Sequence, residues 1–119
     1  MTKQKGEQMK NPKQIVINKE STDSEELGYV IIRTYSAGVH AGYLKSKNGK
    51  EVTLVNSRRI WYWKGAATLS QMAVEGVSCP EECKFSVPVP EITLLEAIEI
   101  IPCSAVAEEN IKAVKEWKN

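Results

Sequence analysis

The stretch that decides the fold runs from Val39 to Val55, VHAGYLKSKNGKEVTLV. At its centre stands the pair Asn48-Gly49, and Asn-Gly readily takes the two positive-φ positions of a tight hairpin turn. On a strand over residues 39–47, Val39, Ala41, Tyr43 and Lys45 would share one side before the turn, and residues 51–55 include three β-branched residues after it. The stretch therefore predicts two antiparallel strands joined by a short turn.

Further strands and two helices are expected on either side of this hairpin. Runs rich in β-branched and aromatic residues predict strands, and apolar residues at helical spacing predict helices. The expected strands are 29–35, 58–64 and 92–101, and the expected helices are 65–76 and 104 to about 117. This pattern predicts a small α+β fold, with a mainly antiparallel, half-barrel-like β core of about five or six strands and two short helices.

Length and composition predict one ordinary globular domain preceded by an arm. The 119 residues suffice for a single domain, and a net charge of +1 argues against a chain built as a polyanion binder. We expect residues 1–27 to form a flexible N-terminal arm, basic and then acidic, and residues 28–119 to form a single α+β domain. No apolar run is long enough to predict a membrane span, and no secretory signal is present, so we expect no membrane association.

An aromatic and cationic cluster is the first candidate site. On a strand, Trp61 and Trp63 would share one face while Tyr62 points to the other. Their indole rings could stack on a base, and the neighbouring Arg58 and Arg59 could pair with phosphate. The same cluster could instead be core with a charged rim, and the sequence leaves both readings open.

The predicted turn between the first two strands is the second candidate site. Ser36 offers a hydroxyl, and His40 is the only histidine, so it is the first candidate for a general base. A lone histidine without a partner acid or nucleophile is more often structural, or hydrogen-bonds a ligand. Arg33, in the preceding strand, would bring a third cation to the site.

The sequence carries no strong signature of catalysis or of a metal centre. Cys79, Cys83 and Cys103 with His40 could supply the four ligands of zinc on paper, but their spacing is a weak zinc signal. Phosphate-loop, dinucleotide-binding and nucleophile-elbow motifs are absent. We therefore predict no catalytic residue, no metal and no cofactor, and the sequence favours binding over catalysis. An enzyme that uses His40, for example to cleave a nucleotide, stays open as a third and less favoured hypothesis. The odd number of cysteines favours free thiols in a reducing compartment.

Two unusual motifs carry a resemblance to a known group of proteins. The runs 33–40 (RTYSAGVH) and 58–66 (RRIWYWKGA) resemble a family of small uncharacterised proteins of tailed bacteriophages, over about residues 28–117. The resemblance implies no activity. It implies a phage-encoded accessory protein in the host bacterial cytoplasm.

These observations lead to a functional hypothesis and one alternative. The hypothesis is a homo-oligomeric phage accessory protein that sequesters a small nucleotide-like ligand without turnover, and so counters host defence signalling. The alternative is a host-takeover factor that binds a host protein or nucleic acid through the aromatic and arginine cluster. The predicted ligand-binding residues are Arg33, Tyr35, Ser36, His40, Arg58, Arg59, Trp61 and Trp63.

Overall fold

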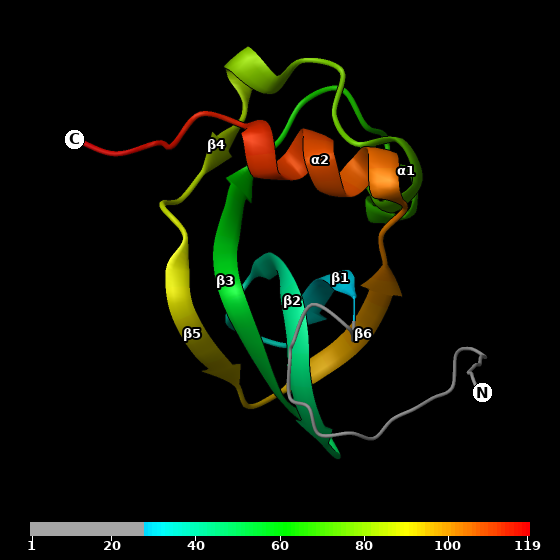
Figure 1. The fold of residues 1–119 in the computed structure, drawn as a ribbon, viewed down its shortest axis with the longest axis vertical. Coiled ribbons are helices and arrows are strands. Elements are labelled where there is room, and N and C mark those ends of the chain that lie inside the picture. The colour runs from blue at the N-terminus through cyan, green and yellow to red at the C-terminus, as the bar shows by residue number, and fades with distance from the viewer. Residues whose placement is uncertain (1–27) are drawn as a thin grey trace, which may run out of the picture.

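The computed structural model describes residues 28–119, and the predicted arm over residues 1–27 lies outside the described residues. The predicted α+β class, with its mainly antiparallel strands and two helices, is confirmed (Figure 1). The elements in chain order are β1 (Tyr29–Thr34), β2 (Val39–Asn48), β3 (Glu51–Tyr62), α1 (Leu69–Glu75), the 3-10 helix η2 (Pro80–Glu82), β4 (Lys84–Phe85), β5 (Val89–Leu94), β6 (Ala97–Pro102) and α2 (Ala105–Ala113).

The β2–β3 hairpin turns one residue later than the sequence predicted. Asn48 is the last residue of β2 and pairs with Glu51, so Gly49 and Lys50 are the two central residues of the turn. Gly49 has a φ of 62°, a left-handed conformation that glycine adopts without steric cost. Glycine at the first central position is the arrangement of a type II′ hairpin turn, which explains the shift from the expected Asn-Gly centre.

The sheet curls because one short connection joins its two sides. Its strands run in the order β4-β3-β2-β1-β6, and β5 pairs with β3 beside the shorter β4. The sequence predicted one strand over residues 92–101, but Leu95 and Glu96 separate β5 from β6. β5 pairs with β3 whereas β6 pairs with β1, so the chain crosses between opposite edges at this connection (Figure 1).

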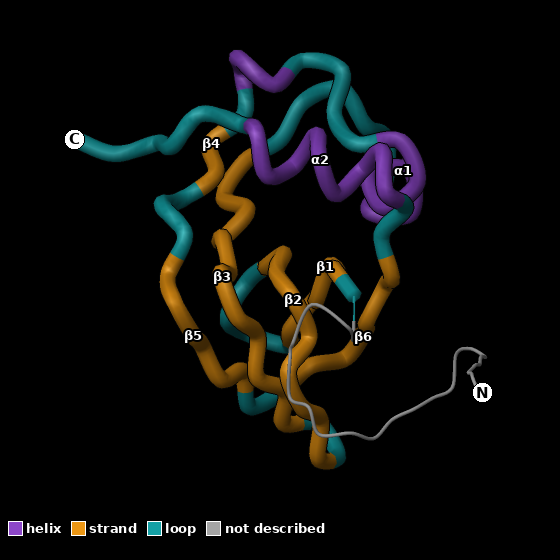
Figure 2. Tube along the Cα trace, viewed as in Figure 1, coloured by secondary structure: helices purple, strands orange, loops and turns teal. Residues whose placement is uncertain are grey.

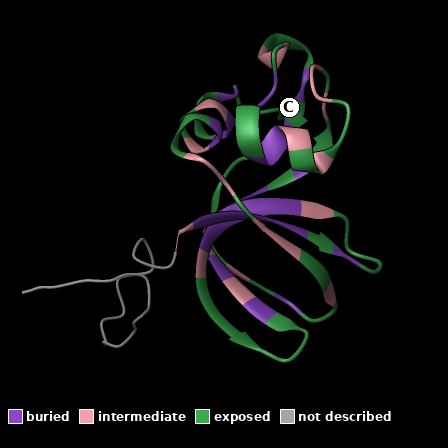
Figure 3. Ribbon diagram, turned by 90° about the vertical axis from the view of Figure 1, so that its right-hand side faces the viewer, coloured by how far each residue is buried: buried purple, intermediate pink, exposed green. Residues whose placement is uncertain are grey.

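Two apolar cores lie on the two faces of the sheet. β1, which lies between β2 and β6, supplies both, because successive side chains of a strand point to opposite faces. Figure 3 shows buried residues along the middle of the sheet and on the helices, with exposed residues at the hairpin ends. The core facing the helices includes Tyr29, Ile31, Ala41, Ile60, Met72, Phe85 and Ile111, and the core inside the curved sheet includes Val30, Ile32, Val52, Leu54 and Leu94.

Both α-helices lie at one end of the molecule, above the strands (Figure 2). Ser104, where the second helix was expected to begin, caps α2, since its hydroxyl accepts a hydrogen bond from the Ala107 N–H at 3.0 Å. The predicted extension of this helix to about Trp117 is wrong. Val114 has extended dihedral angles, and the Trp117 N–H donates to the Phe85 carbonyl at 2.9 Å, so the chain leaves the helix and runs beside β4.

Asn110 of α2 holds the segment that follows α1. Its Oδ1 accepts from the Val77 N–H at 2.8 Å, and its Nδ2 donates to the Val77 carbonyl at 3.0 Å. Its side chain also packs against Gly76, the residue at which the first helix was expected to end, which caps α1 with a φ of 80°. A side chain on residue 76 would collide with Asn110, so this contact fixes how the two helices meet.

We predict that Asn110→Ala lowers the free energy of unfolding by about 1–3 kcal/mol, because it leaves a partly buried N–H and carbonyl without partners. Urea denaturation measures this loss. Glu109→Ala, an exposed neighbour on the same helix, is the control and should change stability by less than about 0.5 kcal/mol. Equal stabilities for the two variants would contradict the assigned role of Asn110.

Candidate ligand-binding surface

The two sequence motifs lie side by side, but their side chains divide between the faces of the sheet. His40 is the register partner of Arg59, and Ala41 is the partner of Arg58. Register partners in an antiparallel sheet point to the same face, whereas neighbours along a strand point to opposite faces. Arg58 therefore faces the helices, and Arg59 lies with His40 on the other face.

Arg58 is a structural residue rather than the predicted phosphate-binding cation. It is 2% exposed, and its guanidinium donates from Nε to the Ser86 carbonyl and from Nη1 to the Ile111 carbonyl, both at 2.9 Å. It also lies over the Phe85 ring, with 5.5 Å between the guanidinium carbon and the ring centre. Burial lowers the pKa of Arg58 from its usual value, but the guanidinium stays charged. Its charge lies at the last turn of α2, where the helix dipole favours a cation.

His40 is also part of the interior. It is 1% exposed, and its Nε2 lies 2.9 Å from the Ala37 carbonyl oxygen. Burial lowers the His40 pKa below its ordinary value of 6.5, and the charge of Arg59 lowers it further, against the raising effect of the hydrogen bond to Ala37. Through its contact with Ala37, the neutral ring stabilises the turn between β1 and β2. In the same turn, the Thr34 hydroxyl donates to the Gly38 carbonyl at 2.7 Å.

The three remaining candidates near this turn are exposed, and two of them contact acids at the β6 edge. Arg33 Nε forms an ion pair with Glu99 at 3.0 Å, and the Ser36 hydroxyl lies 3.5 Å from a Glu96 carboxylate oxygen. Tyr35 is 77% exposed. Because Arg33 pairs with Glu99 and Arg58 is buried, the three predicted cations do not converge on one pocket.

The two tryptophans of β3 and its following loop have different environments. Trp63 is partly buried against the core, and its indole N–H donates to the Ala66 carbonyl at 3.2 Å. Trp61 is 65% exposed. The register shifts between Ile60 and Tyr62 where β3 pairs with β4, which breaks the strict alternation that predicted a shared face.

Trp61 instead stacks on Trp117, from the segment that follows α2. The two rings are nearly parallel, at 9°, with centres 6.3 Å apart, and the Lys84 ammonium lies 5.3 Å from the Trp117 ring centre. Exposed Arg59 precedes Trp61 by two residues on β3. We call Arg59, Trp61, Lys84 and Trp117 the indole surface. It retains two of the residues predicted from the sequence.

Lys84 and Trp117 were not predicted from the sequence as site residues, and the reason differs between the two. Trp117 was expected at the end of a helix, and Lys84 belongs to residues 78–90, a stretch with three prolines in which no helix or strand was expected. The strand β4 that positions Lys84 has only two residues, too few for a periodic pattern. Their meeting with Trp61 depends on tertiary packing, for which the local sequence has no signal.

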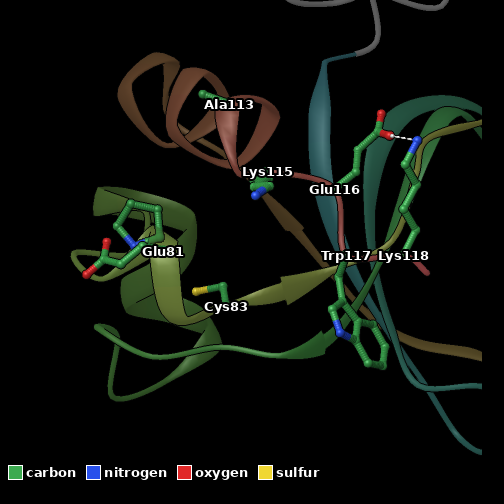
Figure 4. A pocket seen from close by; sticks show the side chains of 8 residues that line it. Glu81, Cys83, Ala113, Lys115, Glu116, Trp117 and Lys118 are labelled. Atoms are coloured by element: carbon green, nitrogen blue, oxygen red, sulfur yellow. Dashed lines mark ion pairs between the residues drawn. The ribbon is translucent and has the colours of Figure 1, made fainter.

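An open hollow of about 560 Å³ shares Trp117 with the indole surface, and Figure 4 shows the side chains that line it. Its lining comes from η2 and from the segment after α2, and its charges are mixed. One ion pair within it joins Lys118 to Glu116 at 3.5 Å. The lining residues are Pro80, Glu81, Cys83, Ala113, Lys115, Glu116, Trp117 and Lys118.

The cysteines of residues 28–119 are free thiols. Within this range, the potential metal ligands that cluster are Cys79, Glu81 and Glu82, whose ligand atoms lie within 4.8 Å of one another. Glu82 already forms an ion pair with Lys64 at 3.0 Å. His40 is buried against the turn and does not join this group, so the four-ligand arrangement considered from the sequence is not assembled.

We predict that Arg58→Met lowers the free energy of unfolding by about 3 kcal/mol or more, because two buried carbonyls lose a charged donor. Arg59→Met is the matched control, and its exposed side chain predicts a change within about 0.5 kcal/mol. Denaturant unfolding of the two variants measures the difference. A small and equal effect would show that Arg58 does not join the sheet to the helices.

We predict that the neutral state of His40 makes stability depend on pH. Because the folded pKa lies below the unfolded value, the unfolded chain binds the proton more readily. The contribution of His40 is present above pH 6.5 and is lost as the pH falls towards the folded pKa. Unfolding measured from about pH 7.5 to about pH 5.5 should show a steeper loss for the wild type than for His40→Gln. Parallel curves would exclude this role.

Comparison with known proteins identifies the family of the chain. No curated protein and no solved structure matches it. Among residues 28–119, none of the helices is both long and apolar enough to cross a membrane. Residues 27–111, more than half of the chain, match the family described as "Domain of unknown function (DUF6948)". The matched range includes Arg59, Trp61 and Lys84 and ends before Trp117. The chain therefore belongs to this family of unknown function.

Proposed function

We propose that this domain is a non-catalytic binding module that takes a flat, anionic, nucleotide-like ligand at the indole surface. The observation that carries the proposal is Trp61, whose large ring is 65% exposed on a strand fixed by neighbours on both sides. Exposed tryptophan is enriched in binding surfaces, and base stacking on an aromatic ring contributes about 1–3 kcal/mol.

The charges around Trp61 suit an anionic ligand. The Arg59 guanidinium can hold phosphate in a bidentate manner, and the Lys84 ammonium supplies a second, more compact charge. Buried His40 is hydrogen-bonded to Ala37, away from solvent, which supports binding without turnover. The proposal keeps Arg59 and Trp61 from the sequence prediction, adds Lys84, and assigns Arg58, Trp63 and His40 to the scaffold; Trp117 lies against the ring of Trp61.

The resemblance to phage proteins supplies the biological setting of the proposal. In that setting the protein would act in the host bacterial cytoplasm, as a homo-oligomer, and would counter host defence by sequestering a nucleotide signal. The alternative function uses the same surface for a host protein or nucleic acid, because exposed tryptophan and arginine are also frequent hot spots of such interfaces.

We predict that Trp61→Ala and Arg59→Ala each weaken nucleotide binding at least about tenfold, since each removes a contact worth about 1.4 kcal/mol or more. Calorimetric titration with nucleoside monophosphates, nucleoside triphosphates and cyclic dinucleotides measures the affinities. Leu95→Ala, an exposed apolar residue at the β5–β6 connection, is the control and should bind like the wild type.

Failure of the whole panel to bind, or unchanged affinity in Trp61→Ala, would contradict the proposal. Salt-sensitive binding of a single-stranded oligonucleotide, lost in the same two variants, would instead support the nucleic-acid form of the alternative.

A further inference from the structure

We infer that Trp117 is an internal occupant of the ligand site: the segment after α2 covers the stacking face of Trp61 in the free protein and competes with the ligand for it. This inference rests on the proposed function and adds its regulation. The carrying observation is that a ring from elsewhere in the chain already lies parallel to Trp61, as an incoming base would.

Trp117 engages the same groups that the ligand would need. Its ring lies at 9° to that of Trp61, with centres 6.3 Å apart, within the range of offset aromatic stacks. The Lys84 ammonium lies 5.3 Å from the Trp117 ring centre, so the cation assigned to phosphate is also engaged. A ligand that stacks on the face of Trp61 covered by Trp117 must therefore displace Trp117 from both partners.

The segment that carries Trp117 is held by few contacts. After α2 ends, one backbone hydrogen bond, from the Trp117 N–H to the Phe85 carbonyl at 2.9 Å, and a single bridge between Phe85 and Glu116 tie it to β4. The ion pair of Lys118 is with Glu116 of the same segment (Figure 4), so it does not fasten the segment to the rest of the domain.

The surroundings leave the segment free to move while Trp61 stays in place. Residues 115–119 are all exposed, and the open hollow lies along them (Figure 4). Trp61 belongs to β3, which pairs with β2, β4 and β5. A segment with few buried contacts and few backbone hydrogen bonds opens at lower free energy than a central strand.

The family comparison separates the two rings in the same way. The matched range, residues 27–111, contains Trp61, Arg59 and Lys84, whereas Trp117 lies beyond it. The proposed ligand platform therefore belongs to the part shared with the family. The ring that covers the platform lies outside the matched range.

Competition of this kind lowers the apparent affinity by the fraction of molecules in which Trp61 is uncovered. We predict that Trp117→Ala binds 5′-GMP about three- to tenfold more tightly than the wild type, because an exposed aromatic pair contributes a stabilisation of that size. Lys118→Ala, in the same segment, is the matched control and should keep the wild-type affinity. Titration of the full chain followed by tryptophan fluorescence gives the three dissociation constants.

A second measurement tests the contact without any ligand. The indole N–H resonance of Trp61, assigned with Trp61→Phe, should shift in Trp117→Ala because the ring current of the partner is lost. An unchanged resonance would overturn the inference. Equal or weaker GMP binding by Trp117→Ala would also overturn the inference, because Trp117 would then either have no effect on the ligand or contact it directly. Absence of GMP binding in both proteins, with the resonance shift present, would locate the failure in the proposed function.

Discussion

The structure depends on one buried cation. Arg58 projects from β3 into the space between sheet and helices and donates to the carbonyls of Ser86 and Ile111. These bonds join the central hairpin, the β4–β5 connection and the last turn of α2. A buried charge is tolerated only when its donors are satisfied, so Arg58 fixes where these three parts meet. The segment after α2 starts from this point, which brings Trp117 to β4 and onto Trp61.

The alternation of β3 explains why scaffold and site residues are neighbours in sequence. Arg58 and Arg59 are consecutive, yet one is buried among carbonyls and the other is exposed. The shift in register after Ile60 then leaves Trp61 outside while Trp63 returns to the core. The run from Arg58 to Trp63 looks like one aromatic and cationic patch in the sequence. In the structure, some of its side chains pack in the interior and the others lie on the surface. The surface half, with Lys84 and Trp117, is the part that can meet a ligand.

Local sequence signals were sufficient for most of the elements and insufficient for the site. The hairpin, the cap at Ser104 and the end of α1 at Gly76 follow from turn and capping chemistry, which depends on neighbouring residues. The split of residues 92–101 into two strands depends on pairing with β3 and β1, far away in the chain. The partner of Trp61 lies 56 positions later (117 − 61), and burial of Arg58 needs carbonyls of distant segments. Such contacts leave no periodic pattern to recognise.

We propose that the ligand binds at the indole surface rather than at the turn that carries the first motif. The most direct measurement is a map of backbone amide shifts in two-dimensional NMR spectra of the full chain as nucleotides of the panel are added. We predict that the largest shifts cluster at Arg59, Trp61, Lys84 and Trp117, with small changes at residues 33–40. Shifts concentrated at residues 33–40, with the indole surface unaffected, would contradict the account.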